Sequence, residues 1–176
     1  MGKKVMFVFL VLILVLSLCL SIALPVMADP GAKPVAWVNC GGTPASDKSF
    51  GEFSSYGISV KLLSDGTTVG HIVAHLFDYG EDLWSIGFDQ SQTNFYEADG
   101  AKIAEFVAWV VEKPDGQPFM VKYKLMDYGE PAKGNDKYMI WVWVEIPGLP
   151  GFWWPMYGSG DPIPFPGGNI QVHLRD

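Results

Sequence analysis

Alternation of side chains between two faces, interrupted at short intervals by turn residues, is the feature that most restricts how this chain can fold. Residues 137–146 (KYMIWVWVEI) give the clearest case, because an extended strand points successive side chains to opposite faces. Both faces would then be apolar, one with Tyr138, Ile140, Val142 and Val144, the other with Met139, Trp141 and Trp143. Such a strand is either central in a sandwich or presents an aromatic face to a partner.

Segments with strand character recur along most of the chain, and Gly, Asp, Asn or Pro residues separate them. The short turns favour antiparallel neighbours. We therefore predict an all-β fold, an antiparallel β-sandwich or barrel of about nine strands, preceded by an N-terminal signal helix. The predicted strands lie within residues 35–39, 49–62, 68–77, 83–88, 93–100, 101–113, 119–125, 137–146 and 167–176.

One of these segments, residues 101–113 (AKIAEFVAWVVEK), also fits an amphipathic helix. Its length and its alanines favour the helix. The residues that follow favour a strand, because Pro114, Asp115 and Gly116 form a turn signal before a second alternating segment, residues 119–125. We predict a β-hairpin here.

The N-terminus has the organisation of a secretory signal peptide. Lys3 and Lys4 precede an apolar stretch over residues 5–20, and the residues up to Ala28 offer a small-residue cleavage site. We predict that residues 1–28 are removed, which leaves residues 29–176 as one domain large enough to bury a core. The alternative is an uncleaved signal anchor, because the apolar region, extended to Leu24, reaches the ~20 residues that span a bilayer.

Charge and cysteine content narrow the possible partners. Removal of Lys3 and Lys4 lowers the basic count from 12 to 10 against 19 acidic residues, and moves the formal net charge from -7 to -9. An acidic domain is a poor nucleic-acid binder, and it repels anionic membranes and polyanions.

Cys40 is then the only cysteine, so no internal disulfide can form, and we expect it to be a small buried residue at a Gly-rich strand end.

Four stretches in order along residues 29–176 carry a resemblance to a known family: VNCGGT, Gly70-His71, DYGEPAKGNDKYMIWVW and GGNIQVH. Together they resemble the post-COAP type of small exported prokaryotic β-domain. That resemblance implies a secreted β-sandwich or barrel without an established enzymatic activity, and it carries over no catalytic residues. This chain departs from the pattern at Cys40, where the family usually has glycine, and in a longer, more aromatic segment before the last strand.

Three carboxylates, Asp127, Glu130 and Asp136, are close together between two predicted strands. We interpret them as turn residues, since Asp side chains bond to nearby backbone in turns. Two alternatives remain. One is a calcium-stabilised module, because loop carboxylates supply some of the six to eight oxygens that Ca²⁺ takes. The other is a small secreted hydrolase using Asp127, Glu130 or Asp161, which needs two carboxylates across a cleft.

His71 and His75 suggest a metal pair only if they lie on a helix. On a strand, four residues cover about 13 Å, so the two rings cannot share one ion, although each could join His173 or a carboxylate of a neighbouring strand. We expect ordinary, partly exposed histidines and no bound cofactor.

The segment that we expect to act is an aromatic loop over residues 147–168, with six prolines, six glycines and no lysine or arginine. A Pro-stiffened loop can present aromatic rings to sugars, to a hydrophobic partner or to a bilayer interface. The alternative is that the loop buries its own aromatic side chains over one end of the fold. We predict a non-enzymatic exported module that binds carbohydrate or the cell envelope, outside the cell or at its surface. Its candidate contact residues are Phe152, Trp153, Trp154 and Tyr157.

Overall fold

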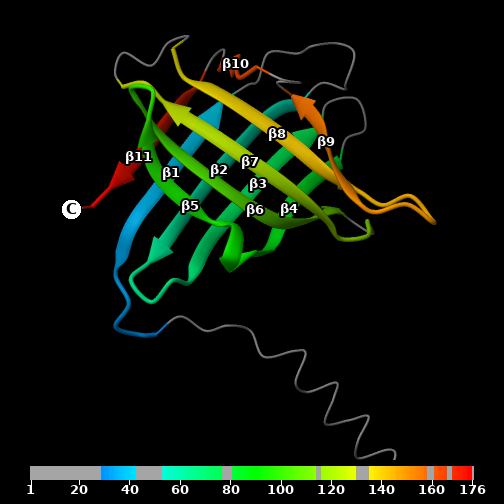
Figure 1. Ribbon diagram of the computed structural model, residues 1–176, viewed down its shortest axis with the longest axis horizontal. Helices are drawn as coiled ribbons and strands as arrows, with labels where there is room; N and C mark the ends of the chain where they lie inside the picture. The colour runs from blue at the N-terminus through cyan, green and yellow to red at the C-terminus, as the bar shows by residue number, and fades with distance from the viewer. Residues whose placement is uncertain are drawn as a thin grey trace, which may run out of the picture.

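The computed structural model describes residues 29–42, 53–76, 81–113, 116–129, 135–157, 161–165 and 168–175 (Figure 1). The predicted signal helix and its cleavage site, within residues 1–28, lie outside these residues, and so does Glu130. The described part of the chain is all-β, as predicted, with one 3-10 turn, η1 (Gln90–Gln92).

The described residues form eleven strands, two more than the sequence predicts. In chain order they are β1 (Pro34–Gly42), β2 (Phe53–Leu63), β3 (Thr68–Leu76), β4 (Glu81–Phe88), β5 (Asn94–Ala98), β6 (Ala101–Lys113), β7 (Phe119–Asp127), β8 (Lys137–Val144), β9 (Phe152–Tyr157), β10 (Ile163–Pro164) and β11 (Asn169–Leu174).

All the strands belong to one antiparallel sheet. Its hydrogen-bonded order is β10-β8-β7-β6-β4-β3-β2-β1-β11, while β5 pairs with β6 and β9 pairs with β8. The order begins at β10 and ends at β11, and no backbone pairing joins these two strands in the described part of the chain, so the sheet is not closed. Strands β1 to β4 pair with their neighbours in the sequence, and residues 64–67 form the short turn between β2 and β3. Strand β1 also pairs with β11, which lies at the other end of the chain.

The ambiguous segment, residues 101–113, is strand β6, so the predicted hairpin is confirmed. Its first half pairs with β5 and its second half with β4, while β7 lies along its other edge. Ala104, Phe106, Ala108 and Val110 share one face, point into the core and are 0% exposed, while Val107 on the other face is buried as well.

The expectation of a loop over residues 147–168 is wrong for residues 152–157 and 163–164. These form β9 and β10, which pair with the second half and the beginning of β8 respectively. Pro155 lies inside β9, and the pairing register shifts beside it, between Ile140 and Trp141. Proline is tolerated at an irregular edge strand of this kind, because no inner ladder needs its missing N–H.

A single large core joins both halves of the sheet. Its buried members come from β1, β2, β3, β6, β7, β8 and β11, so residues far apart in the hydrogen-bonded order pack on each other. Phe106 and Tyr123 stack with ring centroids 5.3 Å apart, and Tyr138 meets Phe165 edge to face at 5.6 Å. Tyr138 of β8 and Ile170 and Val172 of β11 are buried in this core.

Candidate functional site

The β8–β9 hairpin projects beyond the rest of the sheet (Figure 1), and its strand β9 carries all four predicted contact residues. Its turn is well defined: the N–H of Leu149 donates to the carbonyl oxygen of Ile146 at 3.0 Å, with Pro147 second and Gly148 third. Gly148 has a φ of 84°, which is the left-handed conformation that a type II turn requires at its third position. We call residues 141–157 the aromatic hairpin.

Each face of the aromatic hairpin carries its own ring pair. Trp143 and Trp153 are cross-strand partners on the outer face, with centroids 5.2 Å apart. Phe152 and Trp154 pair on the other face at 6.2 Å. The two faces differ in burial, since Trp153 is half-buried against Trp143 whereas Phe152 and Trp154 are exposed.

Gly151 fixes the position of the Trp143 indole. A Cβ atom at Gly151 would lie 2.6 Å from Cε2 of Trp143, so the ring rests directly on the glycine backbone. The indole N–H also donates to the Glu145 carboxylate at 3.1 Å. The ring is therefore held by packing from below and by a hydrogen bond at its edge.

The tip of the hairpin is apolar and exposed. Leu149 is 62% exposed, Trp154 54%, Ile146 43% and Phe152 37%. The alternative in which this segment buries its own aromatic rings is thus wrong for Phe152 and Trp154, although it is right for Phe165, which is fully buried in the core. Ile146 and Leu149 were missed as candidates; large apolar residues on both sides of a Pro-Gly turn were the signal available in the sequence.

The fourth predicted contact residue, Tyr157, ends β9 opposite Ile140. It lies at the end of the strand away from the tip. Among the described side chains of the hairpin, the exposed large apolar ones are Ile146, Leu149, Phe152 and Trp154.

The carboxylates of Asp127 and Asp136 bond to backbone N–H groups. Asp127 accepts the N–H of Gly129 at 2.8 Å and that of Val172 at 2.9 Å. Asp136, fully buried, accepts the N–H of Tyr128 at 3.1 Å and that of Ile170 at 2.9 Å. We call these contacts of Asp127 and Asp136 with β11 the aspartate bridge. The turn interpretation is confirmed for Asp127, whose bond to Gly129 is a local Asx turn.

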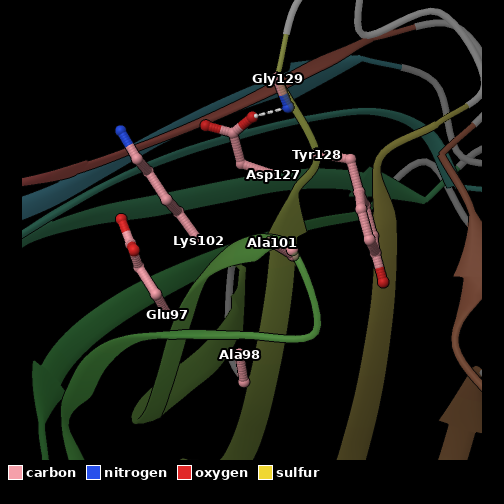
Figure 2. Close-up of a pocket in the computed structure, with 8 residues that line it drawn as sticks. Glu97, Ala98, Ala101, Lys102, Asp127, Tyr128 and Gly129 are labelled. Atoms are coloured by element: carbon pink, nitrogen blue, oxygen red, sulfur yellow. Dashed lines mark hydrogen bonds between the residues drawn. The ribbon is translucent and has the colours of Figure 1, made fainter.

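An open pocket of about 400 Å³ adjoins Asp127, between the β5–β6 turn and the end of β7. Figure 2 shows Glu97 and Lys102 extending from the turn while the Asp127 carboxylate bends back to the Gly129 nitrogen. Both Asp127 oxygens are engaged by backbone N–H groups, so the pocket does not present two unengaged carboxylates. Asp161, the other hydrolase candidate within the described residues, is exposed in a bend after β9.

His71 and His75 lie on a strand, as the sequence predicts, and not on a helix. His71 and His75 are exposed on the outer face of β3, and Nδ1 of His75 lies 2.6 Å from the Asp82 carboxylate. Within the described ranges, no group of three or more His, Cys, Asp or Glu side chains is arranged to hold a metal ion.

Cys40 is buried, as predicted, with its Sγ 3.8 Å from the Tyr56 hydroxyl. Burial raises the pKa of the thiol to about 12, so it is protonated at neutral pH.

The described residues contain no helix with the length and apolar character needed to cross a membrane. Comparisons of the chain with protein-family models, with curated proteins and with solved structures found no match.

Proposed function

We propose that this protein is an exported, non-enzymatic β-module that binds the cell envelope through its aromatic hairpin. The observation that carries the proposal is the exposure of Ile146, Leu149, Phe152 and Trp154 on one projecting, pre-formed hairpin. Apolar side chains that are scattered need no explanation, but a contiguous exposed set on a rigid element is typical of a contact surface. The ordered turn lowers the entropy cost of binding.

The chemistry of the tip favours a lipid surface as the partner. Residues 145–151 contain one charged side chain, Glu145, whose carboxylate already bonds to Trp143. A sugar site needs polar groups beside its aromatic platform, whereas Ile146, Leu149 and two prolines offer none. At the tip the side chains are aliphatic, and the tryptophans lie behind them. This arrangement matches a bilayer, in which aliphatic side chains enter the hydrocarbon and indoles lie at the interface. The net charge, which is -7 for the whole chain and -9 without residues 1–28, favours a zwitterionic over an anionic surface.

Tryptophans on the outer face behind the tip also support an orientation in which the tip enters the bilayer. Trp109 pairs with Met120 across β6 and β7, Trp84 pairs with Val111 across β4 and β6, and Trp143 pairs with Trp153. These pairings lie toward the same end of the sheet as the hairpin turn, and Trp84 and Trp109 are 44% and 41% exposed. A partial belt of indoles thus lies near the tip, at the level where an interface would meet the sheet.

We also infer the architecture that presents the hairpin: an open barrel, in which the aspartate bridge takes the place of the missing backbone pairing. The shared core of both halves of the sheet supports this, as do the bonds from Ile170 and Val172 to Asp136 and Asp127. Export through residues 1–28 belongs to the same proposal, with the resemblance to small exported β-domains as its support.

Vesicle binding tests the proposal. Residues 29–176 hold every described strand and the core, so this fragment is prepared first and its cooperative melting is verified. We expect it to co-sediment with phosphatidylcholine vesicles, and Phe152→Ala/Trp154→Ala to bind about tenfold more weakly or worse, because each ring is an exposed anchor. Tyr128→Ala is the matched control, since Tyr128 is 38% exposed but follows the end of β7 that lies away from the hairpin turn.

The control variant should bind like the wild type. Equal binding by the double variant, with unchanged melting, would remove the hairpin from the mechanism. Equal losses in the control and the double variant would mean that binding is not localised to the tip.

A further inference from the structure

Four neighbouring strands, β3, β2, β1 and β11, contain no Asp or Glu, although the chain has 19 of them. The same strands hold all three histidines of the chain, His71, His75 and His173, together with Lys61. Their outer face is thus a neutral-to-basic surface on an acidic protein. A surface of this kind favours an anionic ligand.

Strand register arranges the outer side chains of this face in two rows. Trp37 of β1 is directly opposite Lys61 of β2 on one side and His173 of β11 on the other. Two residues along, Asn39 is opposite Ser59 and Gln171 in the same way. The rows cross three strands, a width of about 10 Å. We call this surface the polar platform.

Side-chain contacts fix the residues at the centre of the polar platform. The Trp37 indole stacks on His173 with centroids 4.5 Å apart and planes 17° from parallel. Since His173 covers the β11 side of the indole, the opposite side is turned toward β2. The Ser59 hydroxyl donates to the Asn39 amide oxygen at 3.0 Å, which fixes two hydrogen-bonding groups beside the ring.

An open pocket of about 470 Å³ lies on that β2 side, lined by Pro34, Trp37, Asn39, Ser59, Lys61 and Arg175. Two cations line it and no carboxylate does. The Arg175 guanidinium is held at the rim by a bond from Nη1 to the Pro34 carbonyl oxygen at 3.4 Å. Within the described part of the chain, neither Lys61 nor Arg175 forms an ion pair, since the ion pairs there are His75 with Asp82 and Lys122 with Glu105.

We propose that the polar platform binds an acidic oligosaccharide, a chain of sugar rings that carry carboxylates. One ring packs against the free side of Trp37, as apolar sugar faces do on indoles. Lys61 and Arg175 bind the carboxylate, while Asn39 and Ser59 bond to ring hydroxyls. An aromatic wall flanked by an amide, a hydroxyl and two cations fits this ligand better than a small inorganic anion, which would use the charges alone.

Isothermal titration of the full chain in a non-ionic detergent tests the site with tetragalacturonic acid as the probe. The fully methyl-esterified tetramer keeps the rings and removes the charges, and tripolyphosphate keeps charge and removes the rings. We expect the acid to bind at least about tenfold more tightly than either, with affinity falling as NaCl is raised.

Three variants locate the binding. Lys61→Met keeps the apolar stem and removes the charge, so the preference for the acid over the ester should fall about tenfold or more. Trp37→Phe keeps a ring for folding and should weaken acid and ester alike. Lys102→Met removes an exposed lysine from β6, outside the platform, and should change nothing.

Equal binding of acid and ester, or no binding of either, overturns the proposal. Equal binding of tripolyphosphate and the acid replaces it with an unspecific anion patch. An equal loss in Lys102→Met would assign the effect to net charge rather than to the platform. Phe152→Ala/Trp154→Ala should bind the sugar normally, so failure of the hairpin proposal and failure of this one are distinguishable.

Discussion

At the scale of single residues, the most consequential side chain is the Asp136 carboxylate. It is fully buried, and its two oxygens accept the N–H groups of Tyr128 and Ile170. The sequence predicts that Asp127 and Asp136 belong to a turn. It does not predict their bonds to β11, because those partners lie 45 and 34 residues further along the chain and only the folded sheet brings them together.

Replacing Asp136 tests this role. In Asp136→Asn one oxygen becomes an NH₂ group that faces an N–H donor, so one buried donor loses its acceptor, at a cost of about 1–3 kcal/mol. Asp136→Ala leaves both donors without an acceptor and should cost more. Urea denaturation measures both changes. The exposed Asp161→Asn is the control and should stay within about 0.5 kcal/mol of the wild type; an Asp136→Asn protein as stable as the control would contradict the bridge.

Cys40 provides a second residue-scale prediction. Burial raises the pKa of its thiol to about 12 from 9.0, so the thiolate fraction at pH 8 is about a thousandfold smaller than in the unfolded chain. With Cys19 replaced by serine, native protein should react with a thiol reagent at least about a thousandfold more slowly than protein in urea. Complete reaction of the native protein within minutes would show that Cys40 is accessible.

At the scale of elements, sequence patterns predict strands with clear alternation and fail where proline and glycine are dense. All nine predicted segments contain a strand, and for residues 101–113 the turn signal and alternating segment that follow predicted the strand against their helical spacing. Strand β9 was missed because Pro155 and two flanking glycine-rich turns indicate a loop. The strand forms nonetheless because Trp153 and Phe152 pair across the strands with Trp143 and Val144. These contacts stabilise the strand, and single-residue strand propensities do not include them.

The hairpin yields an element-scale prediction at Gly151. A side chain there would collide with the Trp143 indole, so Gly151→Val should push the ring off the hairpin and disrupt the pair with Trp153. We expect a changed near-ultraviolet circular dichroism spectrum and a loss of about 1–3 kcal/mol in stability. Gly87→Val is the control, because a Cβ at Gly87 meets no atom within 4 Å. An unchanged aromatic spectrum in Gly151→Val would refute the packing described for Trp143.

At the scale of the whole molecule, one sheet carries two chemically different surfaces. The aromatic hairpin belongs to the β8 end of the hydrogen-bonded order and the polar platform to the β11 end. The polar platform could not be assembled from the sequence alone, because it depends on the pairing of β1 with β11. For the aromatic hairpin, the sequence offered Phe152, Trp153 and Trp154 as candidates but not their pairing with β8. The net charge led us to expect repulsion of all polyanions; the strand order instead gathers the carboxylate-free strands on one side.

Alkaline pH should unfold the whole molecule. Burial raises the pKa values of Cys40 and Tyr138 to about 12, and it also raises those of Tyr56 and Tyr123. These groups release protons near pH 9 to 10 when unfolded, so the unfolded state binds fewer protons above pH 9. Stability is therefore complete below pH 9 and falls between pH 9 and 12, by up to about 1.4 kcal/mol per pH unit and group.

Urea titrations at pH 8, 9, 10 and 11 measure this decline. Tyr123→Phe removes one buried phenol without changing the ring, and should make the decline above pH 10 shallower. A flat profile from pH 8 to 11 would mean that these groups ionise in the folded state.

The aspartate bridge has a consequence for behaviour at high concentration. An unpaired terminal strand normally offers a row of donors to a strand of another copy, which is how edge-to-edge aggregation begins. On β11 the N–H groups of Ile170 and Val172 are already bonded to carboxylates of the same chain. A second molecule that approached this edge would meet engaged donors and two acidic side chains, so we expect the same two aspartates to oppose pairing between copies through the last strand.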